Sequence, residues 1–592
     1  MTEATRAFLD VESSLTGRRW VGPDPQIERL AEGLATSADL PLAVARILAE
    51  RGVTAETAAG FLEPKLRDLL PDPRQLRDMR QAAARLLAAT RQGERIAIFA
   101  DYDVDGGASA TLILDWLRQQ GRDATLYIPD RIDEGYGPNA PAMADLASRH
   151  DLIICVDCGT LSHDAIAAAK GCDVIVLDHH LGGETLPPAM AVVNPNRMDE
   201  TGDLGHLCAA AVVFLTLVEA NRQAREEDGT RLPDLMPMLD LVALATVADV
   251  APLIGVNRAF VRQGLAVMAR RERPGLAALS DIARLDRAPT AFHLGYLIGP
   301  RINAGGRVGR ADLGARCLAA TQVDEAARLA DELDQLNTER RAIEAAVREA
   351  AMAQAEARGI MQAEEGRAAL VWAADANWHP GVVGIVAARM KEATGRPAVV
   401  IGIENGVGKG SARSVPGVDL GRAIQRLATE GWLLKGGGHA MAAGLTVESD
   451  RIEGAMARLD ALLARDLATA PGRNALRISG MLTSEAATLD LVAALERAGP
   501  FGQAAPAPRF AFADVLIDRI GTMGDGRHLR LTLGARGAAR LEAVAWGAME
   551  GSLGPALLAA QGQRMHLAGK LESSFWNGRQ RLRLRLDDAA YA

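Results

Sequence analysis

With 592 residues the chain exceeds what one hydrophobic core normally organises, and its 48% apolar and 24% charged composition excludes a disordered protein. No apolar run reaches the roughly 18 residues that cross a membrane, no export signal opens the chain, and five cysteines form no disulfide framework, so we expect a soluble cytoplasmic protein. The net charge of −9 excludes a generally basic protein that coats nucleic acid. Residues 501–592, however, carry 12 basic against 8 acidic side chains, an excess that suits binding of a polyanion but that a random distribution of charge would also explain.

The first 90 residues predict short helices separated by prolines, an N-terminal lead-in. Four short apolar runs follow, with segments of helical spacing between them, at residues 95–101, 124–130, 151–157 and 172–178. This alternation predicts a parallel sheet with helices on both faces. Every one of the four runs ends in aspartate, and the carboxyl ends of parallel strands meet at one edge, where the functional site of such a sheet lies.

Residues 324–358 contain no glycine or proline and predict one long helix that connects two lobes. Residues 365–463 predict a second α/β lobe with three glycine-rich segments. Beyond residue 476 the pattern changes to short alternating strands, ending in RQRLRLRLD (579–587) after an Asn577-Gly578 turn. We therefore expect an α/β protein with two α/β lobes joined by a long helix, plus a C-terminal β-barrel of the oligonucleotide-binding (OB) type. The predicted boundaries are 1–80, 81–320, 321–362, 363–470 and 471–592.

Acidic and imidazole side chains gather at the predicted strand ends. Asp101, Asp103 and Asp105 alternate directly after the first strand, so they face the same side and repel one another unless cations lie between them. Asp157 ends the third strand. Two further groups are the Asp178-His179-His180 triplet at the end of the fourth strand and Asp249 in an apolar stretch. An unpaired charge at Asp249 would be costly, and a metal would offset that cost.

These donors favour Mn²⁺ or Mg²⁺, because they are mostly carboxylates with one or two imidazoles. Cys155-x-x-Cys158 has the spacing of half a zinc site, but it has no second pair. Five or six mostly anionic ligands suit two cations about 3.5–4 Å apart, the arrangement that assists in-line displacement at phosphorus. Asp157, between the two ligand clusters, is the best candidate for a bridging carboxylate.

A series of motifs extends over nearly the whole chain. In order they are LTGRRW (15–20), FLEPKLRDLL (61–70), DYDVDG (101–106), IPDRIDEGYG (128–137), VDCG (156–159), DHH (178–180), TVADV (246–250), IGPRINAGGRVG (298–309), WHPGVVGIVAAR (378–389), GSARSVPGVDLG (410–421) and GGGHAMAAGL (436–445). The series resembles the DHH phosphoesterase superfamily and, within it, the RecJ family of single-strand-specific 5′-to-3′ DNA exonucleases. Two segments depart from that pattern: Cys208-Ala-Ala-Ala stands where a glycine-rich turn is expected, and 501–506 lacks the usual Gly-Asn-Pro-Glu.

The resemblance implies a DHH catalytic domain, a DHH-associated substrate-binding domain and an OB domain. It implies that Asp103, Asp105, Asp157, His179 and Asp249 bind the two metals. The implied catalytic residues are His180 beside the scissile phosphate, Asp101 as a supporting acid and Asp178. The implied substrate contacts are Arg131, Tyr136, Arg301, Asn303, Ser411, Arg413 and His439.

The substrate contacts have physical support of different strength. Arginine forks match phosphate oxygens, and the small residues around Ser411 suit an anion-binding loop. Tyr136 lies between two glycines, which suits exposure and stacking on a base. His439 fits a substrate contact or a structural turn, and for Arg307 the pattern favours neither a phosphate contact nor a solvated charge. The Arg face of 579–587 fits backbone phosphates or plain solvation, and the neighbouring Phe575 and Trp576 form an aromatic tip.

The function implied is a metal-dependent exonuclease that digests single-stranded DNA from a free 5′ end to 5′-mononucleotides in DNA repair and recombination. A phosphodiesterase for short oligoribonucleotides or cyclic dinucleotides is an alternative that shares the metal core. A non-catalytic DNA scaffold is the second alternative, which the full set of metal acids disfavours. The resemblance also implies a single-strand-binding protein and a RecQ-type helicase as partners; we expect a monomer with no membrane contact.

Overall fold

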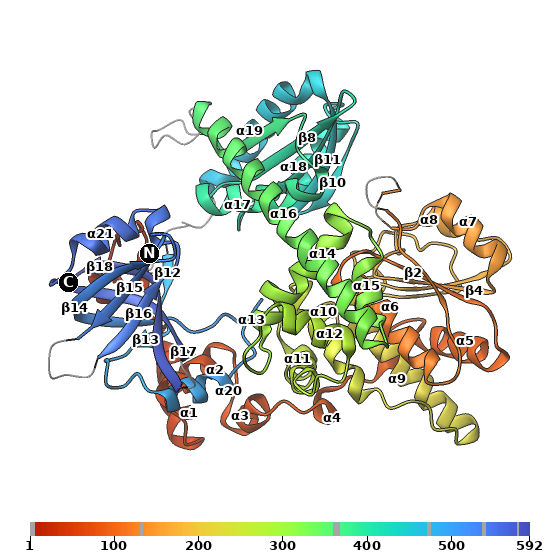
Figure 1. Ribbon diagram of the computed structural model, residues 1–592, viewed down its shortest axis with the longest axis horizontal. Helices are drawn as coiled ribbons and strands as arrows, with labels where there is room; N and C mark the ends of the chain where they lie inside the picture. The colour runs from red at the N-terminus through yellow and green to blue at the C-terminus, as the bar shows by residue number, and fades with distance from the viewer. Residues whose placement is uncertain are drawn as a thin grey trace. The chain divides into compact units, whose positions relative to one another are not determined.

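The computed structural model describes residues 6–130, 134–135, 137–358, 368–469, 475–534, 540–576 and 579–592. The chain divides into two compact units (Figure 1). The larger unit spans Leu70–Pro471, and the smaller unit combines Met1–Leu69 with Gly472–Ala592. None of the helices in the described ranges has both the length and the apolar composition required to cross a membrane.

The first sheet of the larger unit has five parallel strands in the order β3-β2-β4-β5-β6. Their bounds are β2 Ile96–Ala100, β3 Thr125–Tyr127, β4 Leu152–Val156, β5 Asp173–Leu177 and β6 Ala191–Val193. The four strands predicted from the apolar runs are confirmed, while the short strand β6 was not predicted. Strands β2 and β4 are buried along their whole length, which explains why they are continuous apolar runs rather than alternating ones.

Helices cover both faces of this sheet, as predicted. On one face, Met143 and Leu146 of α7 and Ile166 of α8 pack against Phe99 and Val176 of the strands. On the other face, α6 and α9 contact the sheet and one another. The helices of this part of the chain are α5 Met79–Gln92, α6 Val104–Arg118, α7 Ala140–Arg149, α8 His163–Ala167, α9 Ala209–Asp228, α10 Leu239–Ala248, α11 Gly255–Met268, α12 Pro274–Ile282, α13 Ala291–His293, the π-helical segment η4 Leu294–Ile298, α14 Gly299–Val308 and α15 Leu313–Ala319.

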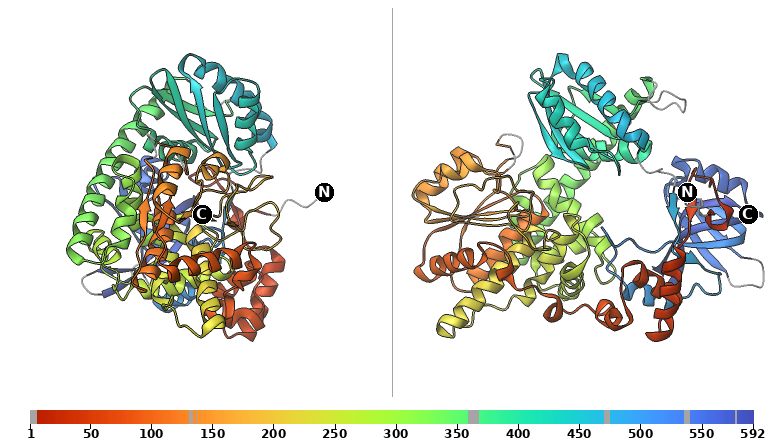
Figure 2. Two further views of the ribbon diagram at one scale, coloured as in Figure 1. Left: turned by 90° about the vertical axis from the view of Figure 1, so that its right-hand side faces the viewer. Right: turned by 180° about the vertical axis from the view of Figure 1, so that it is seen from behind.

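The predicted long helix is α16, Val323–Ala357, and Figure 2 shows that it extends from the first group of helices to a second sheet. Its N-terminal half packs on α12, α14 and α15. Its C-terminal half buries Val347 and Ala351 in a core with Val371 and Val382. Because one helix lies in both cores, it joins the two parts of the larger unit.

The second sheet has the order β10-β11-β9-β8-β7, in which β7 and β8 are parallel and the other pairs are antiparallel. Its elements are β7 Val371–Asp375, α17 Pro380–Thr394, β8 Ala398–Glu404, β9 Val407–Arg413, α18 Leu420–Thr429, β10 Lys435–His439, β11 Ala442–Glu448 and α19 Ile452–Thr469. The predicted second α/β lobe is therefore present. Its glycine-rich segments include strand β9, which contacts α17, and strand β10, which contacts α18.

The smaller unit contains a sheet in the order β13-β14-β15-β16-β18-β17, and β14 also pairs with β17, which joins the two ends of the series from β14 to β17. Its elements in the second half of the chain are β12 Ala475–Arg477, β13 Gly480–Met481, α20 Leu489–Arg497, β14 Phe510–Met523, β15 His528–Leu533, β16 Leu541–Ala545, α21 Leu553–Ala559, β17 Arg564–Trp576 and β18 Arg579–Tyr591.

Of the predicted lead-in, residues 1–69 belong to this smaller unit and residues 70–80 to the larger one. The elements of residues 1–69 include β1 Arg19–Val21, α1 Pro25–Ser37, α2 Leu42–Glu50, α3 Ala55–Leu62 and α4 Leu66–Leu69. Leu34 of α1 and Leu48 of α2 lie in the same core as Phe510 and Phe512 of β14, and β1 pairs with β12. The N-terminal helices thus complete the core of strands that are encoded more than four hundred residues later.

Candidate active site

Three carboxylates follow β2 in a turn that leads directly into α6. Asp103 caps the helix, since its Oδ1 accepts hydrogen bonds from the backbone N–H of Asp105 (2.9 Å) and of Gly106 (3.2 Å). A Cβ at Gly106 would lie 2.3 Å from the carbonyl oxygen of Asp101, so the turn requires glycine there. The tight turn keeps Asp101, Asp103 and Asp105 at the carboxyl edge of the sheet.

Asp105 is buried and is held by the start of another helix. Its two oxygens accept hydrogen bonds from the backbone N–H of Ala209 (2.7 Å) and of Ala210 (2.8 Å), at the N-terminus of α9. These N–H groups have no partner within their own helix, and their dipoles favour a negative charge. The departure at Cys208 leaves this contact intact because the donors are backbone groups.

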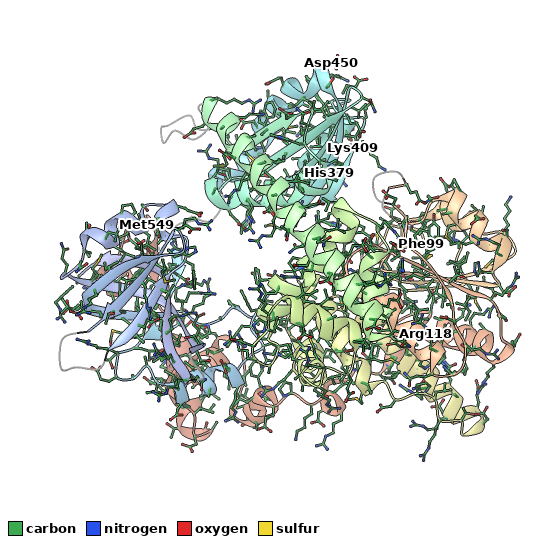
Figure 3. The ribbon with its side chains drawn as sticks, in the orientation of Figure 1. Phe99, Arg118, His379, Lys409, Asp450 and Met549 are labelled. Atoms are coloured by element: carbon green, nitrogen blue, oxygen red, sulfur yellow. The ribbon has the colours of Figure 1, made fainter. Side chains whose placement is uncertain are left out.

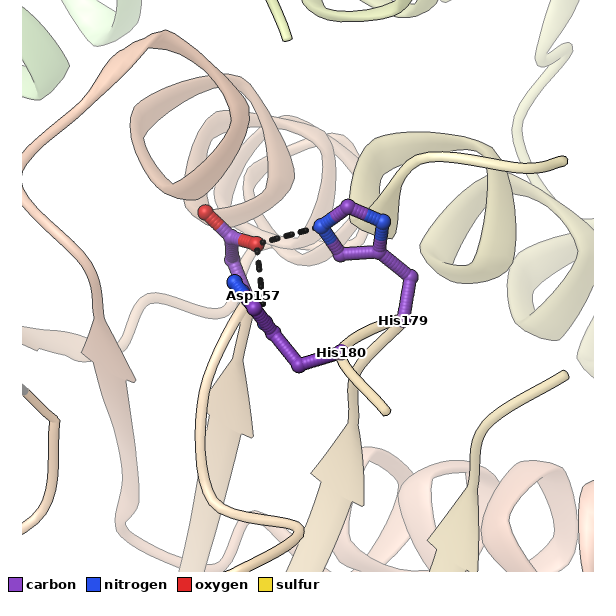
Figure 4. A group of neighbouring side chains, drawn as sticks. All are labelled: Asp157, His179 and His180. Atoms are coloured by element: carbon purple, nitrogen blue, oxygen red, sulfur yellow. Dashed lines mark ion pairs between the residues drawn. The ribbon is translucent and has the colours of Figure 1, made fainter. Parts of the chain in front are cut away.

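Asp157 and the two histidines meet these acids from the ends of β4 and β5 (Figure 4). The Nε2 atom of His179 lies 3.2 Å from Asp157 Oδ1, 3.7 Å from Asp105 Oδ2 and 3.8 Å from Asp249 Oδ2. The Nδ1 atom of His180 lies 3.9 Å from Asp157 Oδ1. The backbone of Asp157 is left-handed (φ 59°), a conformation that surrounding contacts must hold and that recurs at functional sites.

The donor atoms form three overlapping groups, in each of which all atoms lie within 4.8 Å of one another. The groups are Asp105-His179-Asp249, Asp101-Asp103-Asp157 and Asp157-His179-His180. The structure therefore brings together all five predicted metal ligands. Asp157 belongs to two of the groups, which suits a carboxylate that bridges two metals. Asp101, predicted as a supporting acid, lies within one of the groups, beside Asp103 and Asp157.

The electrostatics of the cluster favour cations. Burial, together with the neighbouring carboxylates, raises the pKa of Asp105 and raises that of Asp157 well above its ordinary value. The same two causes raise the pKa of Asp249 to about 8. Raised pKa values mean that the ionised carboxylates repel one another, and divalent cations that replace the protons remove this repulsion. Hard carboxylate oxygens with one or two imidazoles fit Mn²⁺ or Mg²⁺.

Asp178 orients the two histidines rather than joining the ligand groups. Its carboxylate accepts hydrogen bonds from Thr160 N–H (3.0 Å) and Oγ1 (2.7 Å), from His179 N–H (2.8 Å), and from His180 N–H (3.2 Å) and Nδ1 (2.8 Å). Burial alone would raise the pKa of Asp178, but the hydrogen bonds from His180 and Thr160 lower it. Burial would lower the pKa of His180, and the hydrogen bond and charge of Asp178 instead raise it to about 9.

Two asparagines that the sequence analysis did not identify support the same turn. Asn194 Nδ2 donates to Thr160 Oγ1 (2.8 Å) and to the carbonyl of His180 (2.8 Å). Asn196 Nδ2 donates to the carbonyl of His179 (2.6 Å). In the sequence they form only an Asn-Pro-Asn turn after an unpredicted strand, so no local signal marks them.

A pocket of about 640 Å³ lies in the larger unit and brings together three predicted substrate contacts, Ser411, Arg413 and His439. Its lining includes Tyr102, which follows Asp101 in the carboxylate turn, and Lys409, which is labelled in Figure 3 and was not predicted. The pocket therefore extends from the edge of the carboxylate cluster to strands β9, β10 and β11 of the second sheet.

The other predicted contacts lie elsewhere. Arg301 donates from Nε to Asp334 Oδ1 (2.8 Å) and from Nη1 to the carbonyl of Leu297 (2.7 Å). Asn303 Oδ1 accepts from the backbone N–H of Val104 (2.9 Å), so it supports the carboxylate turn. Arg307, left open by the sequence, lines the pocket and donates to the carbonyl of Gly381 (3.2 Å). Arg131 and Tyr136 fall outside the described residues.

Comparison with known families matches three segments of the chain. Residues 95–246 match the DHH family N-terminal domain, residues 366–465 match the DHHA1 domain, and residues 478–588 match the RecJ OB domain. The first match contains Asp101, Asp157 and the histidine pair, and the second contains Ser411 and Arg413. Most of the cluster therefore lies in the first matched segment and most of the pocket lining in the second, while Asp249 of the cluster and Arg307 of the pocket fall between the two.

Relatives match over most of the chain. The single-stranded-DNA-specific exonuclease RecJ of Escherichia coli is 35% identical, over 93% of this chain and 96% of its own length. That of Dickeya dadantii is 38% identical, over 80% and 83%. A crystal structure of Thermus thermophilus RecJ in complex with Mn²⁺ superposes with a TM-score of 0.78 at 29% identity, covering 96% of this chain and 79% of the other. Its complex with Mg²⁺ gives 0.72 at 28% identity, covering 97% and 78%. The chain therefore belongs to the RecJ family of single-stranded-DNA-specific exonucleases.

Proposed function

We propose that this chain is a metal-dependent exonuclease that hydrolyses single-stranded DNA in the 5′-to-3′ direction to 5′-mononucleotides, in DNA repair and recombination. The observation that carries the proposal is the partly buried carboxylate–histidine cluster, with its overlapping ligand groups at the edge of a parallel sheet. Relatives of closely similar length bear the name of single-stranded-DNA-specific exonuclease.

Two divalent ions, Mn²⁺ or Mg²⁺, are the cofactors of this reaction. Asp105, His179 and Asp249 would hold one ion, and Asp103 with Asp101 would hold the other, with Asp157 between them. When bound, such ions lower the pKa of a coordinated water and stabilise charge at the reacting phosphate. The carboxylates orient the ions, and the backbone donors at α9 fix the position of Asp105.

His180 supplies the proton for the leaving 3′-oxygen in this proposal. Its Nδ1 lies 2.8 Å from Asp178, which fixes the ring with Nε2 free to donate a proton, and in the metal-free protein Asp178 raises the pKa of His180 to about 9. Asp178 is thus a positioning residue, and Thr160, Asn194 and Asn196 hold it and the histidine backbones.

In this proposal, the pocket binds the 5′ end of the strand and so sets the polarity of digestion. Ser411, Arg413, His439 and Lys409 line it and offer donors and positive charge to a terminal 5′-phosphate. Arg413 Nη1 already donates to Ser411 Oγ (3.0 Å), so the two side chains are held together. A strand whose 5′ end sits there would pass the carboxylate turn at Tyr102, and its first phosphodiester would be cut. Arg301 would have to leave Asp334 to assist, so we assign it a weaker role.

Further proposals concern the domains, the cellular location, the oligomeric state and the protein partners of this chain. We propose the domain boundaries predicted above, a cytoplasmic location, a monomer, and contacts with a single-strand-binding protein and a RecQ-type helicase. Light scattering tests the monomer, and co-purification with those two proteins tests the contacts.

Digestion of end-labelled DNA tests the function. With Mn²⁺, wild-type protein should release labelled mononucleotide at once from 5′-labelled single strands and only late from 3′-labelled ones. Duplex ends should resist, and Asp157→Ala should be inactive. Short oligoribonucleotides and cyclic dinucleotides serve as competing substrates. Digestion from the 3′ end, or a preference for the cyclic dinucleotides, would overturn the assignment.

A further inference from the structure

Two exposed aromatic rings stack on each other on a segment that packs against residues adjacent to Asp249 and Asp103. Phe292 at the centre of α13 is 53% exposed and Tyr296 in η4 is 72% exposed. Their ring centroids lie 5.0 Å apart with an interplanar angle of 24°. Among the residues whose side-chain exposure is described, which leaves out Phe575 and Trp576, the other exposed Phe, Tyr or Trp residues are Trp546 and Tyr591 of the smaller unit. Keeping two large rings in water costs hydration free energy, which a ligand would recover.

The segment that carries the rings packs against residues that are adjacent in the sequence to the predicted metal ligands. A Cβ at Gly295 would lie 3.4 Å from Val247 Cγ1, and one at Gly299 would lie 3.3 Å from Ala248 Cβ. Val247 and Ala248 immediately precede Asp249. The same position at Gly299 is 3.9 Å from Val104, which lies between Asp103 and Asp105. The segment η4, which directly follows α13, contacts both α10 and α14, and Figure 1 shows these helices in the same part of the larger unit.

The rings are also held in place. Leu294 and Ile298 are fully buried and anchor the inner face of the segment. His293 Nδ1 accepts a hydrogen bond from the backbone N–H of Thr290 (3.0 Å), which fixes the start of the helix. A preorganised stacked pair loses little side-chain entropy when a further ring stacks on it.

We propose that Phe292 and Tyr296 form a stacking shelf for one unpaired nucleobase of the DNA strand, on the 3′ side of the phosphodiester that is cut. This inference rests on the function proposed above. Every base has a π-face, so an aromatic shelf binds without reading the sequence, and a base inside a duplex has both faces covered by its neighbours. The shelf therefore favours single strands.

The shelf and the 5′-end pocket lie at different positions along α14, and this separation places the shelf on the 3′ side of the bond that is cut. The pocket for the 5′ end is lined by Gly306 and Arg307 in the last turn of α14, while Tyr296 lies just before the first. The ten residues of α14 span about 15 Å. The shelf and the 5′-end pocket are thus at opposite ends of this helix, with Val104 of the carboxylate turn against its start.

A cycle of protein and DNA changes tests the shelf. The DNA is a 5′-phosphorylated single strand in which one abasic site is moved stepwise from the 5′ end. In wild-type protein one abasic position should raise KM by about 5- to 150-fold, the equivalent of one base–aromatic stack of about 1–3 kcal/mol. Phe292→Ala/Tyr296→Ala should raise KM for intact DNA by the same factor and should show no further loss at that position.

Control variants separate stacking from folding. Tyr296→Phe and Tyr296→Trp keep a ring and should retain the abasic effect. Tyr591→Ala removes an equally exposed tyrosine of the smaller unit and should leave it unchanged. Turnover of a small chromogenic phosphodiester, too short to reach the shelf, should be the same in all variants, which shows that the site has folded.

The outcomes are distinct. The shelf is wrong if, at every abasic position, the factor by which the double variant raises KM and the factor by which the abasic site raises KM simply multiply. It is also wrong if Tyr296→Phe raises KM as much as Tyr296→Ala does. If the wild-type protein does not digest single-stranded DNA at all, the proposed function fails instead, and the shelf fails with it.

Discussion

Buried aspartates occur in both units of this protein, and they are stabilised in opposite ways. In the smaller unit, Asp588 is fully buried and accepts hydrogen bonds from Thr16 Oγ1 (2.9 Å) and Trp20 Nε1 (3.0 Å), with Arg18 Nε at 3.5 Å. In the larger unit, Asp105 and Asp157 are also buried, lie beside other carboxylates and share His179 as their neighbour.

The difference shows which property of a buried acid indicates a metal. Burial is the same in both places, so burial alone carries no such information. Asp588 has a guanidinium and two neutral donors supplied by the N-terminal segment, and its charge is compensated within the protein. The cluster concentrates negative charge, and its raised pKa values express an electrostatic cost that only protons or cations remove.

The largest effect is expected for Asp157→Ala. Removing the shared carboxylate should lower Mn²⁺-dependent digestion by more than about 10³-fold, as when one member of a catalytic unit is lost. Without metal the same variant should be more stable than the wild type, because one of several repelling charges is gone. Digestion assays and thermal unfolding in a chelator check the two results. An unchanged rate would contradict the bridging position.

His180→Ala should lower turnover by about 10²- to 10⁴-fold, the range for a general acid, with Mn²⁺ affinity retained. Calorimetric titration of metal distinguishes this result from loss of a ligand. Asp178→Asn sharpens the test: Asp178 helps to raise the pKa of His180 to about 9, so turnover of this variant should begin to fall at a lower pH than in the wild type. Loss of metal binding in His180→Ala would show that His180 is a metal ligand and would contradict its role as the proton donor.

Asp588→Ala should behave in the opposite way to Asp157→Ala. It leaves the buried Nε1 donor of Trp20 and the partly buried hydroxyl of Thr16 without this acceptor, so the free energy of unfolding of the smaller unit should fall by about 3–5 kcal/mol. Urea unfolding followed by tryptophan fluorescence measures the change. Turnover of a small chromogenic phosphodiester should stay the same, and a stabilised variant would remove the contrast between the two regions.

The smallest effect concerns pH. In the metal-free protein, the pKa values of Asp105, Asp157 and Asp249 are higher in the folded state than in the unfolded chain, where aspartate titrates near about 3.9. The folded state thus binds protons more tightly, and the stability contributed in this way is present at low pH. It is lost as pH rises towards about 8, the pKa of Asp249.

Added Mn²⁺ should therefore raise the melting temperature more near pH 8 than near about pH 5, because the ligands must lose protons to bind it. Thermal unfolding with chelator or Mn²⁺ at both pH values measures this, and Asp249→Asn should weaken the dependence. An equal shift at both pH values would show that the acids are not coupled to metal binding.

Much of the site follows from local sequence. Strand β2 is an apolar run of five residues that ends at Asp101, and the same pattern ends β4 at Asp157 and β5 at Asp178. Because parallel strands align their carboxyl ends, this local pattern was enough to predict that the acids meet. The long helix was predicted to within one residue at each end, since it has neither glycine nor proline.

What the sequence could not decide depends on partners that lie far apart along the chain. The acceptor of the α9 amides is Asp105, about a hundred residues earlier, and Arg301 pairs with Asp334 of another helix. Asn303, predicted as a substrate contact, supports the turn at Val104.

By itself, the sequence determined where strands and helices form and which acids stand at the strand ends, because residue period and chain breaks are local properties. Only the tertiary structure decided which of these charges are compensated by donors of the protein, as at Asp588, and which lie among other carboxylates in a group that could hold a metal ion, as at Asp157. Compensation is a sum over neighbours in space, and Trp20 and Asp588 become neighbours only after the chain has folded.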